Sequence, residues 1–215
     1  MEVGLRQAPR PQVGETLPCR FGDYVLLLRL AVGGMAEVFL AKHMGLEGFE
    51  KLVVVKRILP EYSDRPEFVA MFLNEARVAA RLNHPNIVQI FNLGKVGETY
   101  FIAMEHVDGE DLRHMVKAAL AAGERGLPPP VLCRVFADLC GGLQHAHSFI
   151  DDRGEALGLV HRDVTPQNII VAYSGFTKIL DFGVAKASLR TEQSHYGTVK
   201  GKIAYLSPEQ VRGGQ

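Results

Sequence analysis

Residues 159–171 read LVHRDVTPQNIIV, and residues 177–183, which follow a Ser-Gly pair, read TKILDFG. Each segment holds an apolar run of strand length, and a turn signal between two such runs predicts a β-hairpin. Antiparallel pairing places residues equidistant from the turn opposite one another. Asn168 precedes the first strand and Asp181 follows the second, so we expect both side chains at one end of the hairpin, with Asp163 just upstream.

This end of the hairpin gathers two carboxylates and an amide, all of which are oxygen donors. A hard divalent cation such as Mg²⁺ takes a few protein oxygens and completes its shell with water and phosphate. For any one of the three residues, a polar loop of capping and turn residues is the simpler interpretation. Their occurrence together at this spacing favours the metal site.

The bulk composition indicates a globular protein. The chain has 215 residues, and its 47% hydrophobic content can fill the core of one domain or of two small ones. Lys and Arg number 24, as do Asp and Glu, which gives no sign of a nucleic-acid or anionic-membrane partner. No apolar run is long enough to span a membrane. The three cysteines lack metal-ligand spacing, and a reducing cytoplasm fits best.

The N-terminal part predicts a tail followed by a glycine turn. Residues 1–21 contain three prolines and no periodicity, and we expect them to form a disordered tail. Residues 24–30 and 37–41 are typical of strands, and AVGGMA at 31–36 separates them. Such a turn can lay its backbone N–H groups over phosphates because glycine has no Cβ. A plain hairpin turn explains the segment equally well.

Lys56 and Glu75 form a candidate ion pair. Lys56 lies in the β-branched run 52–58, and Glu75 shares one face of a helix from Pro66 to about Leu82 with apolar residues at three- and four-residue steps. A carboxylate in an apolar stripe needs a cation, which the upstream strand offers. The simpler alternatives are a lysine that points to water and a glutamate at the edge of the stripe.

The remaining pattern divides the chain into a strand-rich and a helix-rich half. We expect strands around residues 87–90 and 100–104, turned between Gly94 and Gly97. The loop at 105–112 connects the halves, and residues 112–122 and 130–150 are typical of helices.

Taken in order, these residues resemble the protein kinase family, most closely the bacterial eukaryotic-like (Hanks-type) Ser/Thr kinases. The family's signature segments appear as the glycine loop, Val-Val-Val-Lys56, a helix glutamate, His161-Arg162-Asp163 with Asn168, Asp181-Phe182-Gly183, and Ser207-Pro208-Glu209. The resemblance implies an α+β, two-lobed kinase-like fold. Residues 22–107 would form an N-lobe with a five-stranded antiparallel sheet and one helix, and residues 108–215 a partial helical C-lobe through the activation segment.

The resemblance also implies an ATP-dependent protein serine/threonine kinase acting in signalling, with ATP and protein substrates as partners. Asp163 would accept or orient the proton of the substrate hydroxyl, Lys56 would hold the α- and β-phosphates and be oriented by Glu75, and Asn168 and Asp181 would bind Mg²⁺ or Mn²⁺. The implied nucleotide-binding residues are Gly33, Gly34, Val38, Val54, Lys56, Met104 as gatekeeper, Glu105 and Val107 at the adenine, Asp111 at the ribose or substrate, and Ile170.

Several residues depart from the family pattern. Ala31 and Ala36 replace the first and third loop glycines, and Val54 replaces an alanine, which should narrow the adenine pocket. Thr165 stands where a catalytic-loop lysine is usual, and Lys202 stands where a threonine is usual. We hypothesise that the two have exchanged roles, so that Lys202 supplies charge near the γ-phosphate and Thr165 a hydrogen bond to Asp163. A solvated Lys202 and a neutral substitution at position 165 are the alternative.

The C-terminal part raises two further expectations. Arg162 before Asp163 is typical of kinases regulated by phosphorylation of the activation segment, and we favour Thr198, then Ser194 and Thr191, as the acceptor. Members of the family continue past Ser207-Pro208-Glu209 with further helices, so this sequence is either a fragment or a short natural chain. A non-catalytic nucleotide-binding or interaction module therefore remains the alternative function.

Overall fold

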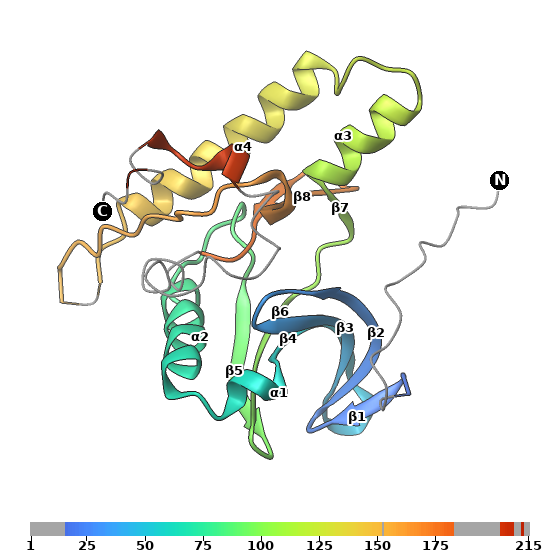
Figure 1. Ribbon diagram of the computed structural model, residues 1–215, viewed down its shortest axis with the longest axis vertical. Coiled ribbons are helices and arrows are strands. Elements are labelled where there is room, and N and C mark those ends of the chain that lie inside the picture. The colour runs from blue at the N-terminus through green and yellow to red at the C-terminus, as the bar shows by residue number, and fades with distance from the viewer. Residues whose placement is uncertain (1–15, 152, 183–202, 209–211, 213–215) are drawn as a thin grey trace. The chain divides into compact units, whose positions relative to one another are not determined.

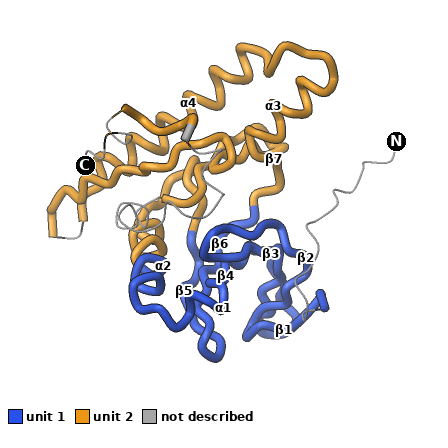
Figure 2. Tube along the Cα trace, in the orientation of Figure 1, with its two compact units in different colours: residues 1–73, 90–106 blue, residues 74–89, 107–215 orange. Residues whose placement is uncertain are grey.

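The computed structural model describes residues 16–151, 153–182, 203–208 and 212 (Figure 1). The chain forms two compact units (Figure 2). Unit 1 comprises residues 1–73 and 90–106, and unit 2 comprises residues 74–89 and 107–215.

Unit 1 is built on a six-stranded antiparallel sheet with the strand order β1-β2-β3-β4-β6-β5. Its strands are β1 (Cys19–Phe21), β2 (Tyr24–Val32), β3 (Ala36–Met44), β4 (Glu50–Ile58), β5 (Ile90–Val96) and β6 (Thr99–Glu105). The prediction of five strands and of a tail through residue 21 is therefore wrong for β1. Three residues are too few to show periodicity, and β1 is stabilised instead by pairing with β2 and by burial of Phe21.

The two faces of this sheet differ in composition. Val38 lies directly opposite Lys56, and Phe39 opposite Val55. Opposed residues project to the same face and successive residues to opposite faces. The Phe39 face packs into the core of unit 1, which consists of Phe21, Tyr24, Leu26, Phe39, Ala41, Val53, Val55, Phe101 and Ala103. The Val38 face carries Lys56.

Helix α2 (Pro66–Ala79) begins with a proline at its first position, where the missing N–H costs no hydrogen bond. Its buried side chains are Phe68, Phe72, Glu75, Ala76 and Ala79. The prediction that Glu75 lies in the apolar stripe is confirmed, since Glu75 is only 9% exposed. The helix ends three residues earlier than expected because Arg81 and Leu82 continue with i→i+3 bonds just before Pro85. Unit 1 also contains η1 (Leu46–Gly48) and α1 (Pro60–Ser63).

The expected strand at 87–90 is wrong for residues 87–89. Ile87 forms an isolated bridge with Ile179, and the Val88 N–H donates to the Ile179 carbonyl at 3.0 Å. The turn between β5 and β6 lies at the end of the predicted segment, at Gly97, whose φ is 57°. Gly94 remains inside β5, where a Cβ would come within 2.7 Å of the Phe101 ring. This glycine therefore serves ring packing and not the turn.

Unit 2 contains the predicted hairpin. A three-stranded sheet joins β7 (Gly109–Asp111), β8 (Ile169–Ala172) and β9 (Thr177–Ile179) in that order. Helices α3 (Leu112–Ala121) and α4 (Pro129–His147) lie within two residues of their predicted starts, and short helical turns occur at η2 (Pro166–Asn168) and η6 (Ile203–Tyr205). Gly109 allows close pairing of β7 with β8, because a Cβ there would lie 2.3 Å from the Val171 carbonyl oxygen.

The core of unit 2 is contributed by its helices, the hairpin and the segment after α2. It consists of Leu82, Ile87, Leu112, Val135, Leu139, Ala146, Ile169, Ile179 and Phe182. Gly142 lets α4 approach the hairpin, since a Cβ there would be 2.8 Å from Ile179 Cδ1 and 3.1 Å from the Asn86 carbonyl oxygen.

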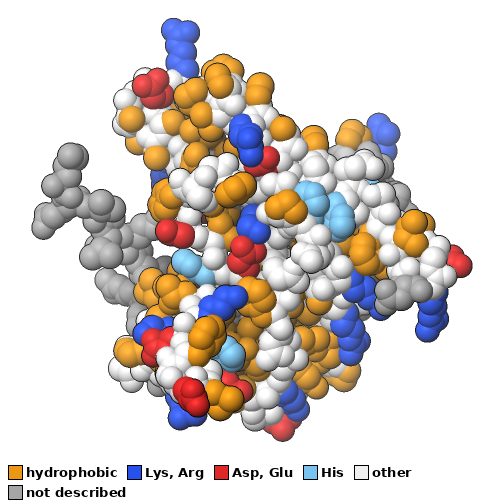
Figure 3. Space-filling model, turned by 180° about the vertical axis from the view of Figure 1, so that it is seen from behind, with side chains coloured by type: hydrophobic (Ala, Val, Ile, Leu, Met, Phe, Trp, Pro, Cys, Tyr) orange, Lys and Arg blue, Asp and Glu red, His pale blue; other side chains and the backbone are white. Residues whose placement is uncertain are grey.

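Two surface properties follow from the composition. None of the helices in the described ranges is long and apolar enough to cross a membrane. On the face drawn in Figure 3, basic and acidic side chains are interspersed, in keeping with their equal numbers of 24 and 24. Positive and negative side chains are therefore mixed on this face as well as equal in number over the whole sequence.

The His84–His145 pair in unit 2 predicts a pH effect on stability. The rings stack with centroids 5.0 Å apart, and burial, followed by the charges of His145 and Lys178, lowers the pKa of His84 from its ordinary 6.5. The unfolded chain then binds a proton before the folded chain does as pH falls. The stability that His84 contributes is complete above pH 6.5 and is lost as pH falls toward the lowered pKa.

We therefore expect His84→Asn to flatten the loss of unfolding free energy on acidification, measured by urea unfolding across this pH range. Asparagine keeps an acceptor for the Asn86 N–H, which bonds to His84 Nδ1 at 3.1 Å. His147→Asn, at an exposed position on α4, is the matched control. Identical pH profiles for wild type and His84→Asn would contradict the prediction.

Candidate active site

Asp163 and Asn168 are joined by hydrogen bonds in the loop before β8. The Nδ2 group of Asn168 donates to the backbone oxygen of Asp163 and to its Oδ2, both at 2.8 Å. Both partners can only accept, so Nδ2 is the donor and the amide orientation is fixed. The Asn168 N–H donates to the Thr165 carbonyl at 2.9 Å, within the turn of η2. The amide oxygen of Asn168 is thereby presented away from Asp163.

His161 connects this loop to the segment after β9. Its side chain is 1% exposed, its Nε2 lies 2.8 Å from the Leu180 carbonyl oxygen, and its Nδ1 lies 3.2 Å from the Asp163 nitrogen. The Asp163 N–H must donate to Nδ1, so Nε2 carries the proton and donates to Leu180, as only the neutral ring can do. The ring also packs against Phe182 at a centroid distance of 4.8 Å. One buried imidazole thus positions the backbone next to both Asp163 and Asp181.

The hairpin register differs by one residue from the expected one. Ile169 pairs with Ile179, and the Leu180 N–H donates to the Asn168 carbonyl at 2.8 Å, so Leu180 lies opposite Asn168. Asp181 follows it at the same end of the hairpin, as predicted. Arg162 and Asp181 have φ values of 60° and 45°, a left-handed conformation that costs a non-glycine residue about 1–3 kcal/mol. Such strain is concentrated at functional sites.

The donor set at this end of the hairpin fits Mg²⁺. Asn168 can offer an amide oxygen and Asp181 a carboxylate, and a nucleotide and water can supply the remaining ligands of an octahedral shell. Across the described ranges, no three His, Cys, Asp or Glu side chains gather into a site that could hold a metal by themselves.

In unit 1, the register brings four of the predicted nucleotide residues to one face of the sheet. Val38 lies opposite Lys56, and Val54 lies opposite Met104. Val54 and Lys56 are two residues apart on β4 and so project to the same side. This face therefore combines apolar side chains suited to a base with one ammonium group suited to phosphate.

The glycine turn between β2 and β3 exposes its backbone. The Gly33 N–H donates to the Ala36 carbonyl at 2.7 Å, which closes the turn. Gly34 is exposed, and no atom lies within 4 Å of the position that a Cβ would take. Ala36 is 5% exposed, so its methyl group is buried.

Asp111 has a structural role that was not predicted. It is the N-cap of α3: its Oδ1 accepts the His114 N–H at 2.8 Å, and its Oδ2 contacts His114 Nδ1. Asp111 also lies directly opposite Ile170 in the pairing of β7 with β8. Its contact with ribose or substrate stays a prediction, as do the nucleotide roles of Ile170, Glu105 and Val107.

The comparison with known proteins identifies the family. A family model described as "Protein kinase domain" matches residues 24–215. The chain belongs to the protein kinase family. This kinase chain is 50% identical over 194 residues to "Tyrosine-protein kinase MasK" of Myxococcus xanthus, covering 90% of this chain and 30% of MasK. It is 36% identical over 193 residues to "Serine/threonine-protein kinase PrkC" of Bacillus subtilis, covering 90% of this chain and 27% of PrkC.

Solved structures agree with this assignment. The crystal structure of the PknI kinase domain of Mycobacterium tuberculosis superposes with a TM-score of 0.61 at 30% identity, covering 94% of this chain and 68% of that one. The kinase-like fold implied by the signature segments is thus confirmed. The chain spans less than a third of the curated relatives MasK and PrkC, so the activity of the whole protein is a matter for proposal.

The remaining kinase residues fall into three groups. Lys56 belongs to unit 1 and Glu75 to unit 2, and their ion pair stays a prediction. Lys202 and the favoured phosphorylation sites Thr198, Ser194 and Thr191 lie outside the described residues. The predicted hydrogen bond from Thr165 to Asp163 is wrong, because the buried Thr165 hydroxyl has no hydrogen-bond partner among the residues that the structure describes.

The contact between His161 and Phe182 was not predicted, since both residues stood out only as parts of motifs. One signal was available for His161, which ends the otherwise apolar run Leu159-Val160-His161. A histidine that is buried needs hydrogen-bond partners for its ring nitrogens. No local signal identified those partners, since Leu180 follows 19 residues later.

The buried hydroxyl of Thr165 predicts a gain in stability on its removal. An unsatisfied buried hydroxyl costs about 1–3 kcal/mol, and valine keeps the branched shape without the polar atom. We expect Thr165→Val to raise the unfolding free energy by about 1 kcal/mol in urea unfolding. Thr177→Val on β9, where the buried hydroxyl likewise has no partner within the described ranges, should give a similar gain. A loss of stability in Thr165→Val would show that the hydroxyl is paired in solution.

Proposed function

We propose that this kinase chain transfers the γ-phosphoryl group of Mg-ATP to serine or threonine hydroxyls of protein substrates. The observation that carries the proposal is the fixed carboxylate of Asp163, which accepts from Asn168 at 2.8 Å while His161 holds its backbone N–H. A carboxylate held in this way can orient a substrate hydroxyl and accept its proton.

The nucleotide base and phosphates are bound by residues that the strand register places on one face of the unit 1 sheet. Val38, Val54 and Met104 contact the base, and Lys56 holds the α- and β-phosphates with Glu75 as its orienting acid. Gly33 and Gly34 offer backbone N–H groups to the phosphates. Asn168 and Asp181 hold Mg²⁺, which when bound neutralises charge on the phosphoryl oxygens. Support comes from the common face of the unit 1 residues and from the common end of the hairpin in unit 2.

The proposal also specifies which hydroxyl-bearing residue of the substrate accepts the phosphoryl group. PrkC is named a serine/threonine kinase, whereas MasK, at 50% identity, is named a tyrosine kinase. We favour Ser and Thr because the signature segments resemble the bacterial Ser/Thr kinases. Lys202 supplies the positive charge that the usual lysine at position 165 would supply, and Lys202→Ala should therefore slow transfer. Transfer at the wild-type rate in this variant would remove Lys202 from the mechanism.

Nucleotide binding tests the proposal independently of the acceptor. Isothermal titration of the chain with ATP should show binding in Mg²⁺ that weakens in EDTA. Lys56→Met and Asp181→Asn should each weaken it about 10- to 100-fold, the equivalent of one charge-assisted hydrogen bond. Lys51→Met, an exposed lysine on the same strand, is the matched control for Lys56 and should bind normally. Equal affinity for wild type and Lys56→Met would refute the assignment.

Binding without transfer would identify the alternative function. Wild type that binds Mg-ATP but phosphorylates no acceptor is expected of a nucleotide-binding or interaction module. The replacement of the usual lysine by Thr165 is the observation that favours this alternative.

A further inference from the structure

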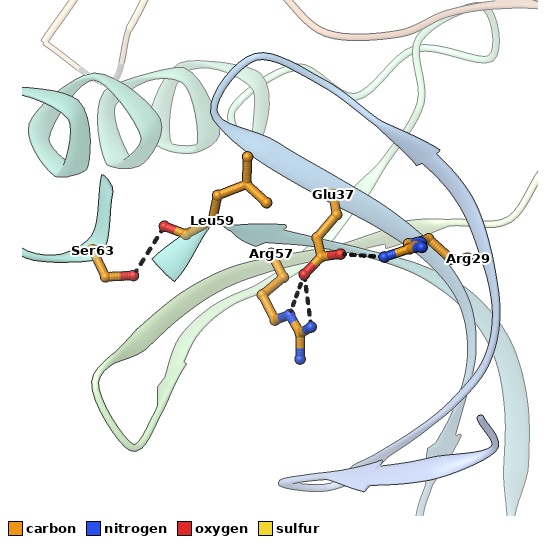
Figure 4. A network of polar contacts seen from close by, with 5 residues as sticks. All are labelled: Arg29, Glu37, Arg57, Leu59 and Ser63. Atoms are coloured by element: carbon orange, nitrogen blue, oxygen red, sulfur yellow. Dashed lines mark hydrogen bonds and ion pairs between the residues drawn. The ribbon is translucent and has the colours of Figure 1, made fainter. Parts of the chain in front are cut away.

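A buried acid lies between two arginines at the base of the glycine turn. Glu37, the residue after Ala36, is 6% exposed, and Arg29 is 8% exposed (Figure 4). The Oε1 atom of Glu37 accepts from Arg57 Nη2 at 2.7 Å and from Arg57 Nε at 3.2 Å. Its Oε2 lies 3.4 Å from Arg29 Nη1. We call these three residues the Glu37 cluster.

The Glu37 cluster joins three neighbouring strands. Arg29 lies on β2, Glu37 on β3 and Arg57 on β4, and Glu37 is directly opposite Arg57. Arg57 immediately follows Lys56 and projects to the opposite face of the sheet. The cluster therefore contacts β4 from the core side, whereas the opposite side of β4 carries Lys56, the lysine proposed to bind the phosphates.

The cluster also lies at an irregularity that sets the path of the turn. Arg29 is opposite Phe39 and Ala31 is opposite Val38, so two steps along β2 match one step along β3. This register shift moves Ala31 to the face that carries Val38 and Lys56, whereas Arg29 stays on the core face. The shift therefore begins at Arg29, whose guanidinium pairs with Glu37.

Backbone bonds hold the far side of the turn. The Leu59 N–H donates to the Met35 carbonyl at 2.9 Å, and Ser63 Oγ donates to the Leu59 carbonyl at 3.4 Å (Figure 4). Gly33 bonds to Ala36 inside the turn. The turn is therefore tied to the segment after β4 through Met35 and to β4 itself through Glu37.

Stability alone does not explain the Glu37 cluster. Taking three charges out of water is costly, and apolar replacements of similar size are often neutral or stabilising. The rings of Phe39 and Phe21, centred 4.9 and 5.5 Å from Arg57 Cζ, recover part of that cost. The better attested use of buried ion pairs is to specify register.

We propose that Glu37 is a positioning residue for the nucleotide phosphates. Its carboxylate locks the register of β2, β3 and β4 and so holds the glycine turn in the conformation that contacts phosphate. The inference rests on the proposed function, because it assigns the turn to phosphates.

The test removes the whole cluster so that no buried charge remains unpaired. The triple variant Arg29→Met, Glu37→Leu, Arg57→Met should keep a melting temperature near that of wild type. Its affinity for ATP should fall about 3- to 10-fold, as expected for the loss of one ordinary hydrogen bond. Its affinity for adenosine, which has no phosphates, should not change. A merely structural role would change both affinities together or neither.

The matched control is an ion pair at the other end of β3 and β4. Lys42 Nζ lies 2.6 Å from Glu50 Oε2, and both side chains are well exposed. Lys42→Met, Glu50→Leu should leave both affinities unchanged. Normal ATP binding by the triple variant at normal stability would overturn the proposal.

A second measurement does not depend on binding. Amide hydrogen exchange of residues 31–36 in the free protein should be faster in the triple variant than in wild type and unchanged in the control. If the triple variant fails to fold, Glu37→Gln takes its place, because glutamine keeps the shape of the side chain but removes the negative charge. The same loss of ATP affinity and the same faster exchange at residues 31–36 are expected of it. Wild type that binds neither ATP nor adenosine would refute the proposed function alone. Unaltered exchange at 31–36 would refute the positioning role.

Discussion

Replacing Asp163 by Asn should lower the rate of phosphoryl transfer about 10²- to 10⁴-fold, the usual range for loss of a catalytic acid or base. Asparagine keeps the size of the side chain and an oxygen that can accept from Asn168 Nδ2, but it cannot take a proton. The affinity for Mg-ATP should therefore change little. Initial rates with labelled ATP, together with isothermal titration, measure the two effects separately.

The control for Asp163→Asn is Asp108→Asn, an exposed aspartate of the same unit that contributes its backbone carbonyl to Tyr173. This variant should transfer phosphate normally. A wild-type rate in Asp163→Asn would show that another group orients the hydroxyl.

Replacing Phe182 by Ala should lower the unfolding free energy by about 3–5 kcal/mol, the usual cost of removing a fully buried aromatic ring. Phe182 is 1% exposed, belongs to the core of unit 2 and packs on His161. Urea unfolding measures the change. The variant should also lose transfer, because His161 positions the Asp163 backbone.

The matched control is Phe176→Ala on the hairpin, where the ring is 52% exposed. Surface substitutions of this kind usually change stability by no more than about 0.5 kcal/mol. Similar losses in the two variants would show that the Phe182 ring is not part of the core.

Local patterns predicted the elements whose sequence signals are contained within a few residues. The hairpin of β8 and β9 follows from two apolar runs and a turn, and the buried position of Glu75 follows from helical spacing. The family resemblance depended on six such segments in order, and the match to residues 24–215 confirms it. In these cases the local preference and the tertiary packing agree.

Features that depend on distant partners could not be predicted. β1 exists because β2 offers an edge to pair with, and Ile87 leaves the expected strand because Ile179 pairs with it in unit 2. The sequence showed Glu37 only as a polar residue in a strand, since its arginine partners lie 8 and 20 residues away. The hydrogen bond expected from Thr165 required a side-chain direction that spacing alone does not fix.

The central claim is that Asp163 directs phosphoryl transfer from Mg-ATP to serine or threonine. The most direct measurement uses ATP labelled at the γ-phosphate and three peptide pools that are identical except for a single acceptor: Ser, Thr or Tyr. The account predicts label in the Ser or Thr pool with Mg²⁺, its absence in EDTA, and its near loss in Asp163→Asn. Label confined to the Tyr pool, or no label in any pool from a chain that binds Mg-ATP, would contradict it.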